Sequence, residues 1–130
     1  MVKLEIGIDV KLFTDNELLE QHKIIKNIPR ALIESGMNYV QNAPESLAFN
    51  KNTPKFLATK GKYIYKLYLK IYKECLNRGL EVKDYSSLWD IYAKHFKLYK
   101  DWVPGEYARK LIEKNKQELL SNRKKIRNEI

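Results

Sequence analysis

Residues 61–79, GKYIYKLYLKIYKECLNRG, carry the clearest structural pattern in the chain. Apolar side chains recur there every three or four residues, which places them on one face of an α-helix. Gly79 follows as a residue suited to the left-handed backbone at a helix C-terminus. The pattern predicts a core helix whose apolar face consists of Ile64, Leu67, Tyr68, Ile71, Tyr72, Cys75 and Leu76. We interpret its tyrosines as core or rim residues, with stacking on nucleotides as the alternative, and expect Lys62, Lys66, Lys70 and Lys73 mostly on the other faces.

An earlier helix is expected from Thr14 to about Asn38. Thr14 and Glu17 match a capping box, in which the hydroxyl accepts from the backbone N–H three residues on and the carboxylate reaches back. Pro29 lies inside this helix and removes one hydrogen bond of its ladder, so we expect a kink there. Residues 1–13 are predicted to form an extended arm that packs across the helices, because a single strand cannot form a sheet.

The rest of the chain is expected to contain long loops and one more long helix. Residues 42–59 contain two prolines and several asparagines and are predicted to be a loop. Residues 86–98 are expected to include a short helix. The last helix should begin near Pro104, since a missing N–H costs nothing in a first turn. Its inward side chains are expected to be Tyr107, Leu111, Ile112, Leu119 and Leu120. The sequence therefore predicts an all-α fold: a compact three-helix single domain, residues 1–130, with an extended N-terminal arm.

Composition limits the kind of protein this can be. A chain of 130 residues with 44% hydrophobic residues can bury one core. No apolar stretch approaches the roughly 20 residues that span a bilayer, and the N-terminus lacks the layout of a signal peptide, so we expect a cytoplasmic, intracellular protein without membrane contact. The single cysteine, Cys75, excludes an intramolecular disulfide framework and a thiolate-cluster metal site.

The charge balance favours a polyanionic partner. Lys and Arg number 25 against 16 Asp and Glu, a net charge of +9. Such an excess attracts nucleic acids or nucleotides over long range and gains from counterion release. Part of the excess can also reflect the Lys- and Asn-rich composition that AT-rich genomes produce.

Three segments carry short motifs: Glu20-Gln21-His22 with Ile28-Pro29-Arg30; Glu74-Cys75-Leu76-Asn77-Arg78-Gly79 with Val82-Lys83-Asp84; and Asp101-Trp102-Val103-Pro104 with Glu106. In this order and at these separations, the segments resemble the phage endonuclease V family of pyrimidine-dimer DNA glycosylases with abasic-site lyase activity. The resemblance covers most of the chain. It implies an endonuclease V-like fold of three helices with little or no sheet.

The resemblance also implies a reaction at the N-terminus. In the family, the α-amine left after Met removal attacks C1′ of a damaged nucleotide and forms a Schiff base. Here that amine belongs to Val2, or to Met1 if Met1 is retained. Its reference pKa, near 8 against about 10.4 for lysine, leaves far more neutral nucleophile at neutral pH. Alignment on Pro29-Arg30 places Asn27 at the position of the family's catalytic glutamate, and alignment on Gln21-His22 places Pro29 there, so neither supplies a carboxylate.

Binding residues follow from the same resemblance. Phosphate or nucleotide contacts are implied for side chains of the arm and the first helix: Lys3, Gln21, His22, Lys26 and Arg30. Further phosphate contacts are candidates on the basic last helix, at Lys114, Lys116, Arg123 and Lys124; complementing the helix dipole is the alternative role for its basic end. We expect neither a metal nor a cofactor, because the two histidines are far apart without paired acids.

Two functions remain open from the sequence. The first is a DNA glycosylase with abasic-site lyase activity. The second is a catalytically inactive binding protein, such as a phage sponge that sequesters nucleotide immune signals in the former active-site cleft. The ligand is DNA in the first case and a small nucleotide or DNA in the second. The aromatic residues around Trp89 and Trp102 fit the core, a stacking surface or a dimer surface, and the sequence does not specify an oligomeric state.

Overall fold

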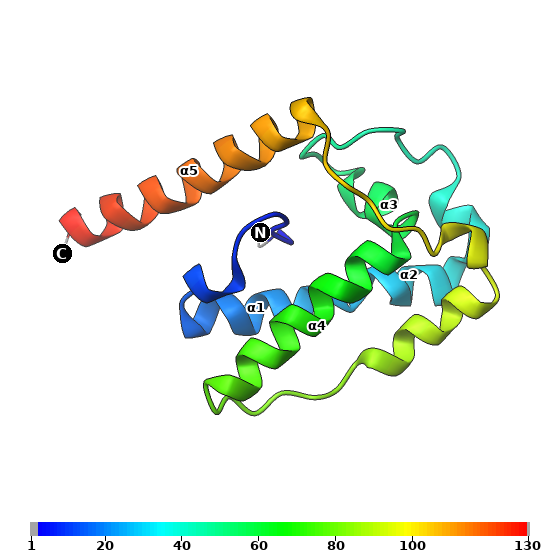
Figure 1. Ribbon diagram of the computed structural model, residues 1–130, viewed down its shortest axis with the longest axis horizontal. Coiled ribbons are helices and arrows are strands. Elements are labelled where there is room, and N and C mark those ends of the chain that lie inside the picture. Colours follow the sequence, from blue (N-terminus) through cyan, green and yellow to red (C-terminus); the bar gives the residue numbers. More distant parts are fainter. Residues whose placement is uncertain (1–2, 130) are drawn as a thin grey trace.

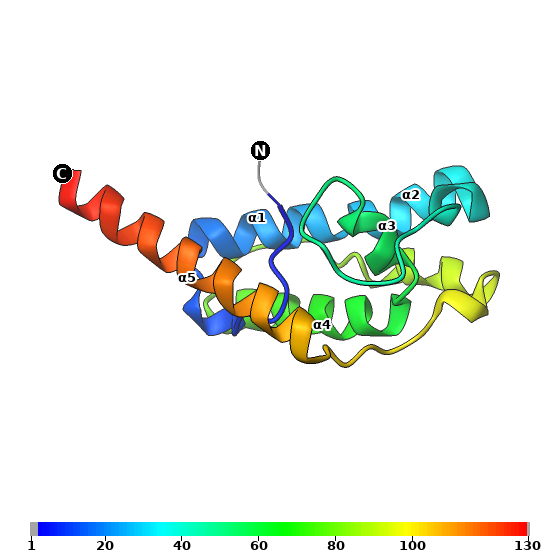
Figure 2. The ribbon, with the colours of Figure 1, turned by 90° about the horizontal axis from the view of Figure 1, so that it is seen from above.

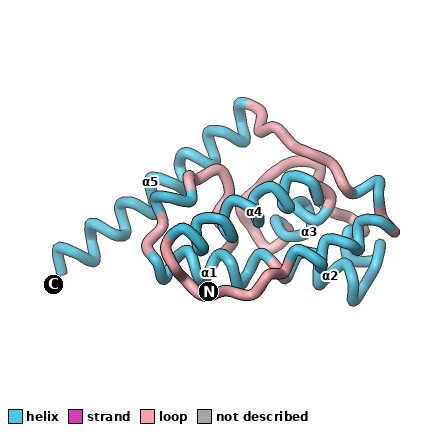
Figure 3. Tube along the Cα trace, turned by 60° about the horizontal axis from the view of Figure 1, so that its bottom comes forward, coloured by secondary structure: helices cyan, strands magenta, loops and turns pink. Residues whose placement is uncertain are grey.

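The computed structural model describes the backbone of residues 3–129 and the side chains of residues 3–122. Within this part of the chain there is no strand (Figure 3). The five α-helices of these residues are α1 (Asp15–Ile25), α2 (Asn27–Ser35), α3 (Thr53–Ala58), α4 (Gly61–Asn77) and α5 (Glu106–Glu129). Four 3₁₀ helices join them: η1 (Val10–Leu12), η2 (Gly36–Val40), η3 (Ser86–Ala93) and η4 (Phe96–Leu98). The all-α prediction is confirmed, and the expected count of three helices is corrected to five.

The first long helix is divided into α1 and α2. Its start matches the predicted capping box: Thr14 Oγ1 accepts from the Glu17 N–H at 3.2 Å, and Glu17 Oε1 accepts from the Thr14 N–H at 2.8 Å. The division falls one turn before Pro29, because this proline cannot donate to the Ile25 carbonyl and its ring crowds that oxygen. The structure thus interrupts the helix at Lys26, three residues before the proline at which a kink was expected.

Three parts of the chain differ from the prediction. Helix α5 begins at Glu106, so Pro104 precedes the helix and does not lie in its first turn. Helix α2 ends at Ser35 and not near Asn38, because Gly36 adopts a φ of 57°, which leaves the right-handed helix. The segment 42–59, expected to be a loop, contains α3. This helix has a proline in its first turn and buries three consecutive apolar side chains, so its short length concealed it among turn-forming residues.

The helices form two layers. Seen from above, α1 and α2 run along one layer and α4 along the other, with α3 beside α2 (Figure 2). Most of the predicted apolar face of α4 lies between these layers, and Cys75 is buried there as expected. Leu76 was expected on this face, but it lies on the surface with 54% of its area exposed. The core between the layers includes Leu18, Ile25, Leu32, Phe56, Leu57, Ile64, Tyr68 and Ile71. Trp89 from η3 joins this core with 5% of its surface exposed.

The N-terminal arm crosses the helices (Figure 2), as predicted, but Val10–Leu12 form the 3₁₀ helix η1 and are not extended. Ile6 and Ile8 are buried on either side of Gly7. Gly7 has a φ of 74°, and a Cβ there would stand 2.5 Å from Cγ2 of Ile112 on α5. A glycine is required at this crossing because the arm must turn with a positive φ and pass directly against α5.

Helix α5 packs along one narrow face. Its 24 residues correspond to about 36 Å, and its C-terminal half extends away from the rest of the molecule (Figure 1). Ala108, Ile112 and Leu119 contact the core at helical spacing. The expected inward position of Tyr107 is wrong, because 69% of this side chain is exposed. Over the residues described, none of the helices is both long and apolar enough to cross a membrane.

Candidate nucleic-acid interface

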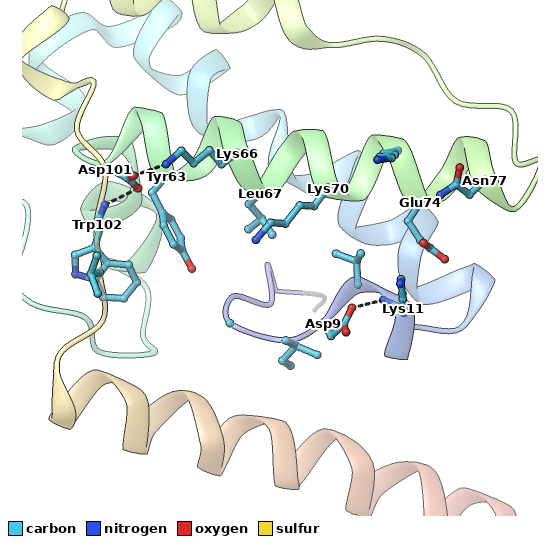
Figure 4. Close-up of a pocket in the computed structure, with 15 residues that line it drawn as sticks. Asp9, Lys11, Tyr63, Lys66, Leu67, Lys70, Glu74, Asn77, Asp101 and Trp102 are labelled. Atoms are coloured by element: carbon cyan, nitrogen blue, oxygen red, sulfur yellow. Dashed lines mark hydrogen bonds and ion pairs between the residues drawn. The ribbon is translucent and has the colours of Figure 1, made fainter.

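Helix α4 presents a row of lysines on the side facing the arm. Lys66, Lys70 and Lys73 follow one another at spacings of four and three residues, so they share one side of the helix. These lysines form the floor of a groove of about 800 Å³. The arm residues 7–11 form one wall and residues 101–103 close one end (Figure 4). We call this space the α4 groove.

The acidic side chains that line the α4 groove are already engaged. Asp101 forms an ion pair with Lys66, and its other oxygen accepts from the Trp102 N–H at 2.9 Å. The hydrogen bond from Lys66 is the main reason that the pKa of Asp101 lies below its usual range. Glu74 pairs with Arg78 at 2.8 Å. These contacts neutralise or occupy the two carboxylates.

Two of the lysines have no such partner. Lys70 and Lys73 are exposed, and neither makes an ion pair or hydrogen bond with another side chain that the structure describes. In Figure 4, Lys70 points from α4 into the space beside the arm. The third acid of the groove, Asp9, accepts from the Lys11 N–H at 3.0 Å and so caps η1. The groove therefore offers the ammonium groups of Lys70 and Lys73 to an anion, and Lys11 on the arm adds a third lysine without a described ion pair.

Aromatic rings close one end of the groove. Trp102 meets Tyr63 edge-to-face, with ring centroids 5.1 Å apart, and meets Phe56 in the same way at 5.4 Å. Trp102 and Tyr63 are both half-buried. Burial, with a smaller contribution from Asp101, raises the pKa of Tyr63, which therefore remains a neutral phenol at neutral pH.

The segment that carries Trp102 is tied to the start of α4. The Lys100 carbonyl accepts from the N–H groups of Lys62 at 3.1 Å and Tyr63 at 3.3 Å, which would otherwise be unpaired in the first turn of the helix. Together with the Lys66–Asp101 ion pair, these bonds fix the end of the groove. Trp102 is held in place by backbone contacts and not only by packing.

The sequence-predicted residues Lys3 and Gln21 hold the arm. The buried Gln21 amide accepts from the Glu5 N–H at 2.7 Å and donates to the Lys3 carbonyl at 3.0 Å, as a neighbouring strand would. On the other side, the buried Asn115 side chain of α5 accepts from the Lys3 ammonium and donates to the Glu5 carboxylate. The Gln21 amide is thus occupied, whereas the Lys3 ammonium also lies 5.1 Å from the centre of the Phe49 ring.

His22 and Lys26 meet around a different residue. The His22 ring stacks on Tyr85 at 4.9 Å and is only 3% exposed. The Lys26 ammonium lies 4.8 Å from the centre of the same Tyr85 ring and 3.4 Å from its hydroxyl. Burial is the main cause that lowers the pKa of His22. Its Nε2 atom is buried and lacks a hydrogen-bond partner among the described residues.

The remaining predicted residues contact neither the Lys3–Gln21 pair nor the His22–Lys26 pair through a described side-chain bond. Asn27 and Arg30 are exposed, and neither side chain bonds to another described residue. On α5, Lys114 is exposed and Lys116 is half-buried. Four predicted positions fall outside the described part: Met1 and Val2 entirely, and the side chains of Arg123 and Lys124. Among the residues described, no group of three His, Cys, Asp or Glu could hold a metal ion.

Sequence reasoning missed the α4 groove. It placed Lys66, Lys70 and Lys73 away from the apolar face, and their helical spacing was the available signal. The sequence does not show that the lysine side of α4 faces the arm and residues 101–103, because these segments are distant from α4 in the chain.

Motif residues that suggested a family have structural contacts here. Arg78 pairs with Glu74 and with Asp15 at 3.0 Å, and donates to the Phe13 carbonyl at 2.8 Å. The Tyr68 hydroxyl accepts from the Tyr85 N–H and donates to Asp84. No protein-family model, no curated protein and no solved structure matches the chain. The endonuclease V resemblance therefore stays a prediction that depends on the three motifs.

Proposed function

We propose that this protein binds nucleic acid in the α4 groove, with Lys70 and Lys73 contacting phosphates. The observation that carries the proposal is that these two ammonium groups have no acidic partner, while the acids around them are engaged. A row of ammonium groups binds the phosphates of a nucleic-acid chain especially strongly, because each contact with the chain also releases counterions. The net charge of +9 adds attraction over a longer range.

Binding is proposed ahead of strand cleavage. Asn27, at the position aligned with the catalytic glutamate, is exposed and has no described carboxylate bonded to it. An amide cannot accept a proton as a carboxylate does. The family resemblance nevertheless makes DNA the nucleic acid to test first, and borohydride trapping with abasic-site DNA tests the amine chemistry. A covalent adduct at the N-terminus would establish the lyase.

The binding proposal is tested with charge-matched variants. A double variant, Lys70→Gln with Lys73→Gln, removes the two groove lysines of α4 that have no described ion pair. Its control, Lys23→Gln with Lys94→Gln, removes two exposed lysines that do not line the groove. Fluorescence anisotropy with labelled DNA should give affinity about tenfold weaker for the groove variant, equivalent to roughly 1.4 kcal/mol, and near wild type for the control. Equal losses in both variants, or no binding by the wild type, would refute the proposal.

A small nucleotide is the second candidate ligand. The groove volume of about 800 Å³ falls within the range of small-molecule sites, about 300–1,000 Å³. A sponge that sequesters nucleotide immune signals in the cytoplasm of a phage-infected cell would use such a site. Calorimetry against mono- and dinucleotides separates the two: a nucleotide that binds more tightly than an oligonucleotide would favour the sponge.

A further inference from the structure

The α4 groove combines phosphate-binding lysines with an accessible aromatic end. Starting from Trp102 and Tyr63, the groove continues past Lys66 to Lys70 (Figure 4), and Lys73, one turn further along α4, also lines it. From Tyr63 to Lys73 the helix rises about 15 Å. A nucleic-acid segment that lies along α4 therefore meets cations along its length and aromatic rings at one end.

Aromatic rings at that end add nothing to the binding of a paired duplex. In a duplex the faces of the bases are covered by their stacked neighbours, so a protein reaches only the base edges and the backbone. In a single strand the base faces are free, and stacking on aromatic side chains is the usual recognition device. Trp102 is only half-buried, so part of its surface remains accessible at the end of the groove.

The position of Trp102 is also fixed before a ligand arrives. The Lys100 carbonyl and the Lys66–Asp101 ion pair hold its segment, and Tyr63 and Phe56 contact its ring. A fixed ring loses little conformational freedom on binding, which favours a stacking role.

We infer that the α4 groove takes single-stranded nucleic acid, with phosphates on Lys70 and Lys73 and a base stacked on Trp102. This inference rests on the proposed function and specifies its ligand. DNA and RNA strands share the chemistry that it requires, because both present base faces and phosphates.

Tryptophan fluorescence tests the stacking directly. The chain has two tryptophans, and Trp89 is buried with an Nε1 that lacks a described partner, so Trp89→Phe costs no described hydrogen bond and leaves Trp102 as the single reporter. Titration with a short single-stranded oligonucleotide should quench its emission. An abasic strand of equal length carries the same phosphates without bases, and should bind at least about fivefold more weakly without quenching. DNA and RNA strands are titrated separately, and the tighter binder identifies the source.

A second variant separates stacking from folding. Trp102→Leu in the wild-type background should weaken binding of the base-containing strand about fivefold and leave the affinity for the abasic strand unchanged. A folding defect would instead lower both affinities.

The outcomes distinguish this inference from the proposed function. Equal affinity for base-containing and abasic strands without quenching, or tighter binding of a duplex, would overturn base stacking, while the lysine-dependent binding would stand. Failure of every strand to bind would overturn the proposed function as well.

Discussion

The His22 imidazole is a buried titratable ring, and both a cationic and an anionic side chain act on it. Tyr68, Tyr72 and Tyr85 lie around it, and Lys26 and Asp84 act on it electrostatically. Burial outweighs the favourable backbone hydrogen bond and lowers the pKa of His22 from its ordinary value of 6.5. The folded protein therefore holds the neutral ring more readily than the unfolded chain does.

We expect His22 to make the folded state acid-sensitive. Because its pKa is lower when folded, the unfolded chain binds the proton first, so stability falls as the pH drops below 6.5 toward the folded pKa. The pKa values of Asp84 and Asp101 are lowered from 3.8, so the contribution of these carboxylates to the stability of the fold is lost only as the pH falls below that value. Thermal unfolding between about pH 7.5 and about pH 5 should therefore show a larger loss of Tm in the wild type than in His22→Phe. Parallel curves would contradict this assignment.

At the scale of elements, Arg78 joins three segments. It lies directly after α4, pairs with Glu74 on that helix and with Asp15 at the start of α1, and donates to carbonyls around η1. The planar guanidinium provides several fixed donors at once, which a lysine cannot reproduce. One side chain thus connects the arm to both layers.

Replacing Arg78 should destabilise the fold. Arg78→Met leaves the Phe13 carbonyl and Glu74 without this donor, and we expect a loss of about 1–3 kcal/mol in the free energy of unfolding. Arg78→Lys should lose less, because it retains the charge. Arg109→Met on the exposed side of α5 is the matched control and should stay within about 0.5 kcal/mol of wild type. Urea denaturation measures all three, and an Arg78→Met value equal to that of the control would contradict the bridging role.

At the scale of the whole molecule, function depends on how the surface charge is distributed. The net charge of +9 is spread over the chain, yet the α4 groove gathers Lys66, Lys70 and Lys73 beside engaged carboxylates. General attraction to nucleic acid and local phosphate contact are thus separable properties, because variants of equal net charge can differ in groove contacts.

Salt dependence should separate them. For single strands, the logarithm of affinity falls with the logarithm of salt concentration by about 0.7 per phosphate contacted. The variant lacking Lys70 and Lys73 should therefore show a slope smaller by about 1.4. The variant lacking Lys23 and Lys94, with the same net charge, should keep the wild-type slope. An identical slope in all three proteins would show that the groove lysines do not contact phosphates.

The sequence by itself determined the local features of this protein. Three of these features depend on interactions within about four residues: the core helix ending before Gly79, the capping box at Thr14 and the helix interruption just before Pro29. The all-α class follows from them, and so does the basic charge. Helix α3 escaped prediction because a short helix leaves a weak pattern. The end of α2 at Gly36 escaped it because the next residues continue as the 3₁₀ helix η2.

Only the tertiary structure decided what the polar residues do. Gln21 and His22 look like ligand contacts in the sequence, yet packing buries both, one to hold the arm and the other against Tyr85. The α4 groove arises where residues 7–11 and 101–103 meet the same side of α4. Contacts between such distant segments depend on how whole surfaces fit together, and no local pattern encodes that fit.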